Sequence, residues 1–217
     1  DAPVLQTTYG RAVKDAGRPA EAVAVYRQAV ARIRDADLYH DLAVAARAAG
    51  NVPEALKAEQ AALALEGRNP AALNGLGLLH AEAGRAAEAA ASFEQAANLD
   101  PSNASYWTNL GNARRELGDV PRAESAYRRA LDVDPRYGDA ANGLGALLVQ
   151  AGKPADAVPW FERAVQQAPD FYEAKLNLGI ALQESGQTAR AAAVYRGILA
   201  SAPPRFARER AAASDLL

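Results

Sequence analysis

Residues 104–137, ASYWTNLGNARRELGDVPRAESAYRRALDVDPRY, hold the pattern that decides the fold. Side chains spaced i, i+3, i+4 and i+7 form the stripe of an amphipathic helix, and here they are Trp107, Leu110, Gly111 and Arg114. Gly118 ends this helix, because glycine is the favoured residue just past a helix terminus. Pro121 suits the first turn of a second helix, where its missing N–H is not needed. The stretch therefore begins with a helix and a tight turn.

The second half of the stretch carries another apolar stripe, made of Ala123, Tyr127, Ala130 and Leu131. Asp134 and Pro135 end it, since a residue that precedes proline is driven out of the helical region. Each helix is then about a dozen residues long, a usual length in globular proteins. The whole stretch predicts a helix, a short turn and a second helix.

The same pattern recurs along the chain every 33 or 34 residues. Glycines recur at the end of each first helix: Gly17, Gly50, Gly84, Gly118, Gly152 and Gly186. Aromatic residues recur in the second helices, with Glu59 in the one missing place: Tyr26, Phe93, Tyr127, Phe161 and Tyr195. Prolines close the later units: Pro101, Pro135, Pro169 and Pro203. One shared period indicates a repeat array, whose units we place at about 3–35, 36–69, 70–103, 104–137, 138–171 and 172–205.

The tetrapeptide NGLG occurs at 74–77 and again at 142–145, inside the first helices of units three and five. Each interior glycine costs roughly 1 kcal/mol against alanine. We expect Gly77 and Gly145 to leave room for the second helix of the unit, and Leu76 and Leu144 to point into the core. A nucleotide-binding glycine loop requires a preceding strand, and the sequence shows none.

These positions resemble the signature of the tetratricopeptide repeat (TPR) family. The matches in the fourth unit are Trp107, Leu110, Gly111, Gly118, Ala123, Tyr127, Ala130 and Pro135. Those in the fifth are Leu144, Gly145, Gly152, Ala157, Phe161, Ala164 and Pro169. Residues 169–199 are also similar to the arrays of O-linked sugar transferases, and the chain as a whole is similar to bacterial TPR scaffold proteins. The first two units depart most, with Tyr9-Gly10 and Leu42-Ala43 in the signature place and no closing proline.

The resemblance implies an all-α fold: a right-handed superhelical solenoid of six helix-turn-helix units, forming a single array over residues 1–217, with a capping helix at 206–217. In the cap we expect Phe206, Ala207, Ala211, Ala213 and Leu217 to supply apolar surface, with the arginines facing water. Pro159 lies beyond the first turn of a helix that starts near Pro154, so we expect a kink or a delayed start there.

The resemblance also implies a concave face lined by the first helices. Transferred by register, its residues are Thr7, Arg11, Lys14, His40, Arg47, Asn74, Leu78, Glu82, Thr108, Asn112, Arg115, Asn142, Gln150, Leu176, Ile180, Gln183 and Glu184. Asn74, Asn112 and Asn142 recur on successive first helices, and amides suit an extended peptide backbone. The alternative is that these asparagines only link helix surfaces.

Charge suggests a polarity along that face. Arg11, Lys14 and Arg47 lie near its start, whereas Asp139, Glu173 and Glu184 make its far end acidic. A ligand with oppositely charged ends would be steered into one orientation. The lysine and asparagine pair with which some TPR modules grip carboxylates is missing from all six units. Tyr137 and Phe171 share one register and either pack on the next unit or offer a stacking platform.

Composition excludes several classes of function. The net charge of −2 and pI of about 5.8 give no field that would recruit nucleic acid. No apolar run approaches the roughly 18 residues of a membrane span, so we expect no membrane partner and a soluble chain, cytoplasmic or periplasmic. The chain has no cysteine, and its two histidines, His40 and His80, lie in different units. We predict no catalytic residues, no metal and no cofactor, and we expect His80 to be a core residue.

The sequence predicts a non-catalytic scaffold that binds an extended peptide or partner-protein segment in the concave face. A second hypothesis is that the chain is the TPR arm of a larger enzyme of the glycosyltransferase or sulfatase type. A third is self-association through the ends of the array. Because the chain starts at Asp1 and contains no methionine, we expect it to be a fragment or a processed form.

Overall fold

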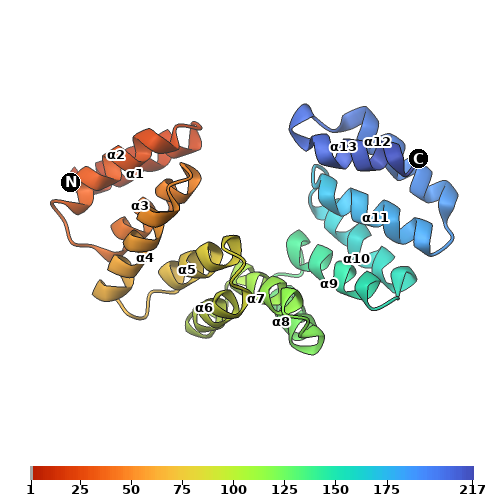
Figure 1. Cartoon of the computed structure of the whole chain (residues 1–217), viewed down its shortest axis with the longest axis horizontal. Helices are drawn as coiled ribbons and strands as arrows, with labels where there is room; N and C mark the ends of the chain where they lie inside the picture. The colour runs from red at the N-terminus through yellow and green to blue at the C-terminus, as the bar shows by residue number, and fades with distance from the viewer. Residues whose placement is uncertain (1) are drawn as a thin grey trace. The chain divides into compact units, whose positions relative to one another are not determined.

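The computed structural model describes the backbone of residues 2–217 and the side chains of residues 8–217. These residues form α-helices and one 3-10 helix, and no strand. The helices are α1 (Ala2–Asp15), α2 (Pro19–Val30), α3 (Ala36–Ala48), α4 (Val52–Leu65), α5 (Pro70–Glu82), α6 (Ala86–Leu99), α7 (Ala104–Glu116), α8 (Val120–Val133), α9 (Gly138–Gln150), α10 (Pro154–Gln167), α11 (Tyr172–Glu184), α12 (Thr188–Ser201), η1 (Pro204–Phe206) and α13 (Ala207–Asp215). Consecutive helices pack in pairs (Figure 1), which confirms the all-α fold and the helix-turn-helix units.

The turn inside each pair depends on glycine. Gly118 has a φ of 73°, in the left-handed region that favours glycine, and the five equivalent glycines have φ between 70° and 80°. The N–H of Gly118 donates to the Arg115 carbonyl at 3.0 Å, and the Asp119 N–H donates to the Arg114 carbonyl at 2.9 Å. Pro121 lies in the first turn of α8. The local turn predicted from the sequence is confirmed.

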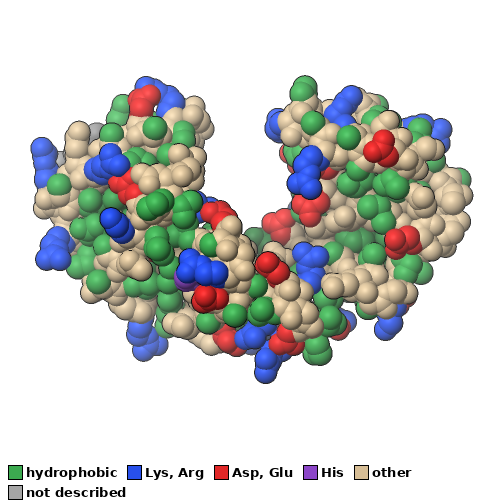
Figure 2. Space-filling model, in the orientation of Figure 1, with side chains coloured by type: hydrophobic (Ala, Val, Ile, Leu, Met, Phe, Trp, Pro, Cys, Tyr) green, Lys and Arg blue, Asp and Glu red, His purple; other side chains and the backbone are tan. Residues whose placement is uncertain are grey.

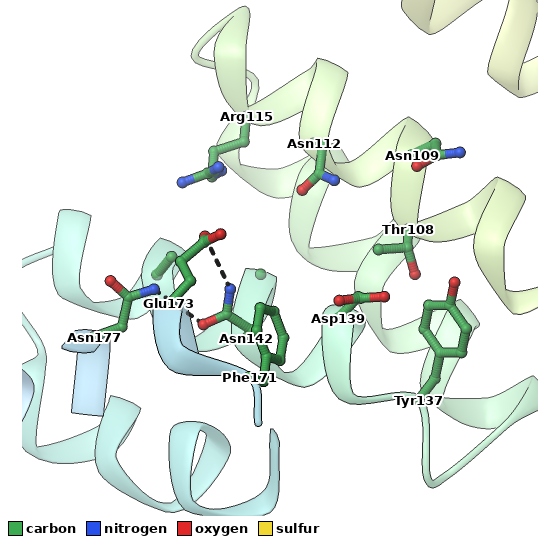
Figure 3. A pocket seen from close by; sticks show the side chains of 12 residues that line it. Thr108, Asn109, Asn112, Arg115, Tyr137, Asp139, Asn142, Phe171, Glu173 and Asn177 are labelled. Carbon is green, nitrogen blue, oxygen red and sulfur yellow. Dashed lines mark hydrogen bonds between the residues drawn. The ribbon is translucent and has the colours of Figure 1, made fainter. Parts of the chain in front are cut away.

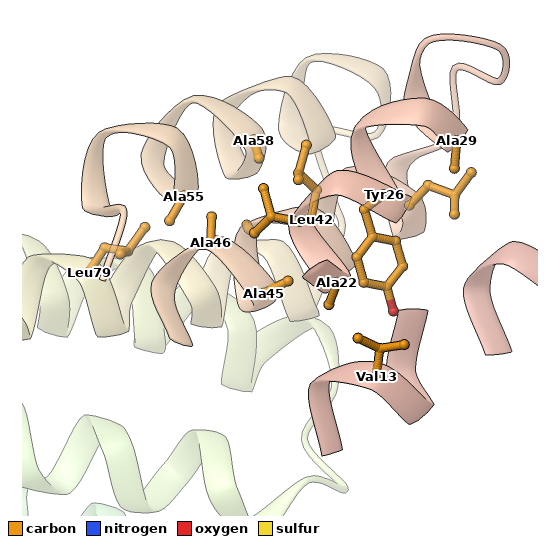
Figure 4. Packing of buried hydrophobic residues seen from close by; sticks show 13 residues of the cluster. Val13, Ala22, Tyr26, Ala29, Leu42, Ala45, Ala46, Ala55, Ala58 and Leu79 are labelled. Carbon is orange, nitrogen blue, oxygen red and sulfur yellow. The ribbon is translucent and has the colours of Figure 1, made fainter. Parts of the chain in front are cut away.

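The chain divides into two compact units, Asp1–Ser102 with α1–α6 and Asn103–Leu217 with α7–α13. The boundary falls between the third and fourth predicted repeats. The grouping of residues 1–217 into one array stays a prediction. In the first unit, Tyr26 is 1% exposed and is the largest side chain of a buried cluster made mostly of alanine and leucine (Figure 4). Small side chains let the helices approach closely.

The second unit buries Tyr127, Phe161 and Tyr195 in two clusters, each ring at most 1% exposed. A Cβ added to Gly145 would lie 2.8 Å from the Phe161 ring, closer than real Cβ atoms approach other atoms. Gly77 is placed against the ring of Phe93 in the same way, at 2.5 Å. Close approach of the second helix therefore accounts for these glycines, as predicted.

The two leucines of the NGLG stretches differ. Leu144 is 1% exposed and lies in the core, as predicted. Leu76 is only partly buried, which corrects the prediction for the third repeat. The buried face of α5 is centred instead on Leu73 and Leu79, at 7% and 2% exposure.

The C-terminal segment packs on the last repeat as a cap. The Phe206 ring lies 4.7 Å from the Tyr172 ring, and Ala213 is fully buried. Arg210 does not simply face water, because its guanidinium donates to the Leu199 and Ala202 carbonyls at 3.0 and 2.8 Å. Three residues expected to supply apolar surface are exposed: Ala207, Ala211 and Leu217. The cap is confirmed, but the prediction was wrong about which face of α13 packs.

Helix α10 begins at Pro154 and continues through Pro159. Of the expected kink or delayed start, the delayed start is therefore wrong, and the kink stays a prediction. Pro159 cannot donate to the carbonyl of Ala155, four residues earlier. Both residues are exposed, so water can hydrate the freed carbonyl and the helix continues past the proline.

Candidate functional site

A pocket of about 420 Å³ opens on the first helices of the Asn103–Leu217 unit (Figure 3). Its walls come from α7, α9 and α11 and from the loops before α9 and α11. Almost all of its lining residues are equivalent positions of successive repeats: Thr108 and Asn142; Asn109, Gly143 and Asn177; Asn112 and Ala146; Tyr137 and Phe171; Asp139 and Glu173. Since α7 packs on α9 and α9 on α11, the repeat itself brings these side chains together.

The amides at the floor of the pocket join two helices. Asn177 Nδ2 donates to Asn142 Oδ1 at 3.0 Å, and Asn142 Nδ2 donates to Glu173 Oε1 at 3.4 Å. Asn142 is only 7% exposed. It therefore has the helix-linking role that was the alternative to ligand contact. Asn177, outside the predicted set, is the more accessible member of the pair, since it is half-buried and lines the pocket.

Two other predicted residues make side-chain hydrogen bonds within the protein. The Thr108 hydroxyl donates to the Ala104 carbonyl of its own helix at 2.9 Å, and Thr108 is 3% exposed. Asn112 is exposed, and its Oδ1 accepts a hydrogen bond of 2.7 Å from the Tyr127 hydroxyl. Because that bond occupies Oδ1 of the Asn112 amide, its Nδ2 is the group that remains available to donate to a ligand.

The charged side chains of the pocket are the least satisfied. Within the described part of the chain, the Asp139 carboxylate has no hydrogen-bond or ion-pair partner. Asp139 is exposed, and partial burial of its carboxyl in the recess raises the pKa of that group above its ordinary value. The Nε of Arg115 is buried and makes no hydrogen bond. Unpaired polar atoms in a recess mark a place where a ligand can replace water.

The aromatic residues Tyr137 and Phe171 precede α9 and α11. Both are partly buried against the core cluster of Tyr127, and both also line the pocket. They therefore combine the two roles that the sequence left open, since packing on the core holds each ring at the pocket wall.

The predicted residues of the first unit are placed differently. Arg11 pairs with Asp41 at 3.2 Å, Arg47 with Glu82 at 2.7 Å, and Lys14 with Asp15 at 3.6 Å. Figure 2 shows basic and acidic side chains next to one another on this unit. The predicted basic end therefore does not form a free positive patch, because each of these cations has a nearby anion.

Other predicted residues of the concave face also have partners within the fold. His40 Nδ1 lies 3.1 Å from both carboxylate oxygens of Glu59. Asn74 is half-buried and has an interaction of its own. Leu176 packs on a core cluster, Ile180 is half-buried, and Gln183 accepts from the Tyr195 hydroxyl at 3.0 Å. The side chain of Thr7 lies outside the described residues.

Sequence reasoning placed Asp139 and Glu173 at the acidic far end of the concave face but did not predict that they line one pocket. Their shared register, 34 residues apart on successive first helices, is the signal that could have done so. Asn177 shares a register with Asn109 and Gly143 in the same way. His80, expected in the core, is half-buried.

In the described part of the chain, no three His, Asp or Glu side chains gather as a metal site would require. None of the described helices combines the length and apolar character needed to span a bilayer.

The tetratricopeptide repeat pattern matches residues 9–65, 40–104 and 108–170, and a second pattern of the same description matches residues 148–214. The chain belongs to the tetratricopeptide repeat family. No curated protein matches this TPR chain.

Several solved structures share the TPR fold. PilW, described as a widely conserved type IV pilus biogenesis factor, has a TM-score of 0.83 at 18% identity, over 93% of this chain and 94% of PilW. PilF of Pseudomonas aeruginosa has a TM-score of 0.80 at 20% identity, over 91% and 90%. YrrB, described as a TPR protein with an unusual peptide-binding site, has a TM-score of 0.61 at 21% identity, over 80% and 90%. At these identities the likeness concerns the fold alone.

Proposed function

We propose that this TPR chain is a non-catalytic scaffold that binds an extended segment of a partner protein, and that the pocket of α7, α9 and α11 is its contact site. The observation that supports the proposal most directly is that one recess holds two charged groups left available to a ligand, namely the exposed Asp139 carboxylate, which has no partner among the described residues, and the buried Arg115 Nε, which makes no hydrogen bond. The volume of about 420 Å³ lies in the range of ligand pockets.

The lining favours binding over catalysis. Its aliphatic hydroxyl, on Thr108, donates to a backbone carbonyl rather than to a base, so it is not an activated nucleophile. The remaining groups are amides, carboxylates, one guanidinium and two aromatic rings, which can hydrogen-bond a peptide backbone and hold its side chains. TPR proteins in general bind protein or peptide partners, and YrrB carries a peptide-binding site by its description.

Blocking the pocket tests the proposal. Ala146 lines the pocket on α9, and Ala155 is exposed on α10 outside it. Short random peptides would be selected on the full chain, and their affinities compared between the parent, Ala146→Trp and Ala155→Trp. We expect the first variant to weaken binding by roughly tenfold or more and the second to leave it unchanged.

Because Ala146 also contacts the core, a variant at an exposed position accompanies it. Asn112→Trp on α7 narrows the pocket from a side chain that is exposed, and circular dichroism would verify that both variants remain helical. Peptides that bind the parent and both folded pocket variants equally well would overturn the assignment of the site.

A further inference from the structure

The pocket is electrostatically unbalanced. It contains two carboxylates, on Asp139 and Glu173, and one guanidinium, on Arg115. One Glu173 oxygen accepts from the Asn142 amide, a neutral donor, and Asp139 has no partner among the described residues. In the part of the chain that the structure describes, neither carboxylate is in an ion pair with Arg115. The pocket therefore carries an uncompensated negative charge, on two carboxylate residues that are both exposed.

We propose that this pocket selects a lysine or arginine side chain of the bound segment, with Asp139 as the carboxylate that receives it. The inference rests on the proposed function and names the chemistry of the ligand. Hydrogen bonds between charged groups are about twice as strong as neutral ones. An unpaired carboxylate beside hydrogen-bonding amides therefore gains more from a cationic side chain than from a neutral one.

The aromatic rings reinforce the preference. Tyr137 and Phe171 line the pocket beside the two carboxylates, and ring faces attract ammonium and guanidinium groups. The protein already uses such contacts elsewhere in this unit: Lys175 Nζ lies 4.5 Å from the centre of the Tyr172 ring, and the Arg163 guanidinium lies 5.8 Å from the Trp160 ring. A basic ligand side chain fits both the charge and the walls of the recess.

The location of Arg115 completes the arrangement. In Figure 3 Asp139 lies beside Thr108 and Tyr137, on the side of the pocket away from Arg115 and Asn177. The bound segment can therefore place its basic side chain at Asp139 while one of its carbonyl oxygens accepts from Arg115. An acidic side chain at the Asp139 end would meet like charge, so the pocket discriminates by repulsion as well as attraction.

A carboxylate in the first turn of a helix also has an ordinary explanation, because it interacts favourably with the helix dipole. Asp139 is in the first turn of α9, and Asp156 is in the first turn of α10. Both residues are exposed, but only Asp139 lines the pocket. Asp139→Asn therefore removes a carboxylate from a helix N-terminus inside the pocket, and Asp156→Asn removes an equivalent carboxylate outside it. The second variant is the control for the first.

The test uses short random peptides selected on the full chain for binding that Ala146→Trp abolishes. We expect every strongly selected peptide to contain a lysine or arginine whose replacement by glutamine weakens binding roughly 2- to 5-fold, as for an ion pair with an exposed carboxylate. Asp139→Asn should weaken the parent peptide to the same extent and make the glutamine replacement nearly neutral. Asp156→Asn should change neither affinity, and Asp139→Lys should favour glutamate in place of the basic residue.

The two proposals fail in different ways. Peptides that bind in the pocket without a basic residue, or whose affinity is the same for the parent and Asp139→Asn, would overturn the cation preference and leave the binding function intact. A selection that enriches no peptide dependent on the pocket would overturn both.

Discussion

Glu59 occupies the place where the other five repeats have tyrosine or phenylalanine. It is 2% exposed, and both of its carboxylate oxygens lie 3.1 Å from His40 Nδ1. The same repeat is also the one with alanine, Ala43, where the others have glycine: Gly10, Gly77, Gly111, Gly145 and Gly179. The two departures from the pattern have one physical cause.

At the five glycines, an added Cβ would lie between 2.2 and 2.8 Å from a carbon of the aromatic ring of the same repeat. Ala43 has such a Cβ, so a ring at position 59 would collide with it. The narrower Glu59 side chain avoids the collision, and its head lies against Gly75, where an added Cβ would be 1.8 Å from Oε1. We therefore predict that Ala43→Gly and Glu59→Phe are strongly coupled.

The expected magnitudes follow from these contacts. Ala43→Gly alone should destabilise by about 1 kcal/mol, the cost of glycine inside a helix. Glu59→Phe alone should destabilise by about 1–3 kcal/mol through overpacking. In the double variant the collision is absent, so the overpacking cost of about 1–3 kcal/mol is relieved. His40 loses its partner in both Glu59→Phe variants, so that loss cancels from the comparison. The double variant should then be less destabilised than the two single changes add up to, by a coupling of at least roughly 1 kcal/mol.

Urea unfolding followed by circular dichroism would give the four free energies of unfolding. Because repeat arrays need not unfold in one step, hydrogen exchange of α3 and α4 should report the same order. The control is Ala43→Gly with Glu59→Gln, where no ring needs the space and the glycine should give no rescue. If the effects of the single changes simply add, to within about 0.5 kcal/mol, the steric reasoning is refuted.

Three further predictions concern the Glu59–His40 pair and two other contacts within the fold. Burial raises the pKa of Glu59; burial also acts to lower the pKa of His40, but the hydrogen bond to Glu59 and the nearby carboxylates of Asp37 and Asp41 raise it overall. Both groups hold protons more tightly in the folded chain, so their contribution to stability is present at acid pH and is lost as the pH rises through the raised pKa values. The melting temperature of the parent should therefore fall relative to that of Glu59→Gln between about pH 5 and 8. Melting temperatures that change in parallel with pH would contradict this. Tyr127→Phe removes the hydrogen bond to Asn112 and should lower the free energy of unfolding in urea by about 1 kcal/mol. The equivalent residue of the next repeat, Phe161, has no hydroxyl, so a phenylalanine ring is tolerated at this place. An unchanged free energy of unfolding would show that the hydrogen bond contributes nothing. Phe206→Ala should lower the stability of the last repeat by about 1–3 kcal/mol, because the ring is only partly buried. The loss would be seen as faster hydrogen exchange in α12. Leu217 is exposed, so Leu217→Ala should be neutral, and equal effects of the two variants would contradict the packing of the cap.

The parts of the fold that sequence predicted well are those that local chemistry controls. Gly118 and Pro121 set the turn between two helices whatever surrounds them, and the period of the rings and glycines fixed which helices pair. The misplaced face of α13 has a different origin: a nine-residue helix rich in alanine has no clear apolar stripe. The face of α13 that packs is set by two tertiary contacts: the Phe206 ring packs against the Tyr172 ring, and Arg210 donates to a carbonyl near the end of α12. Such contacts cannot be read from the local sequence of the helix.

The candidate site was predictable in type and less so in detail. A repeated asparagine indicated a polar face, but whether Asn142 is available depends on Asn177 across the neighbouring helix. Arg11 and Arg47 looked unpaired in sequence because their anions, Asp41 and Glu82, lie 30 and 35 residues away. Such pairs are visible only once the helices are placed side by side.

The pocket itself arises from a departure from the repeat. On α9 the residues Gly143 and Ala146 are small, whereas the equivalent residues of the flanking helices are larger: Asn109 and Asn112 on α7, and Asn177 and Ile180 on α11. The surface of α9 is therefore recessed between α7 and α11, and side chains of all three helices line the recess. Gly143 also admits the Tyr127 ring, which would lie 2.4 Å from an added Cβ. One glycine of the second NGLG thus serves both the packing of the preceding repeat and the depth of the pocket, so a larger side chain there would disturb the fold and the site together.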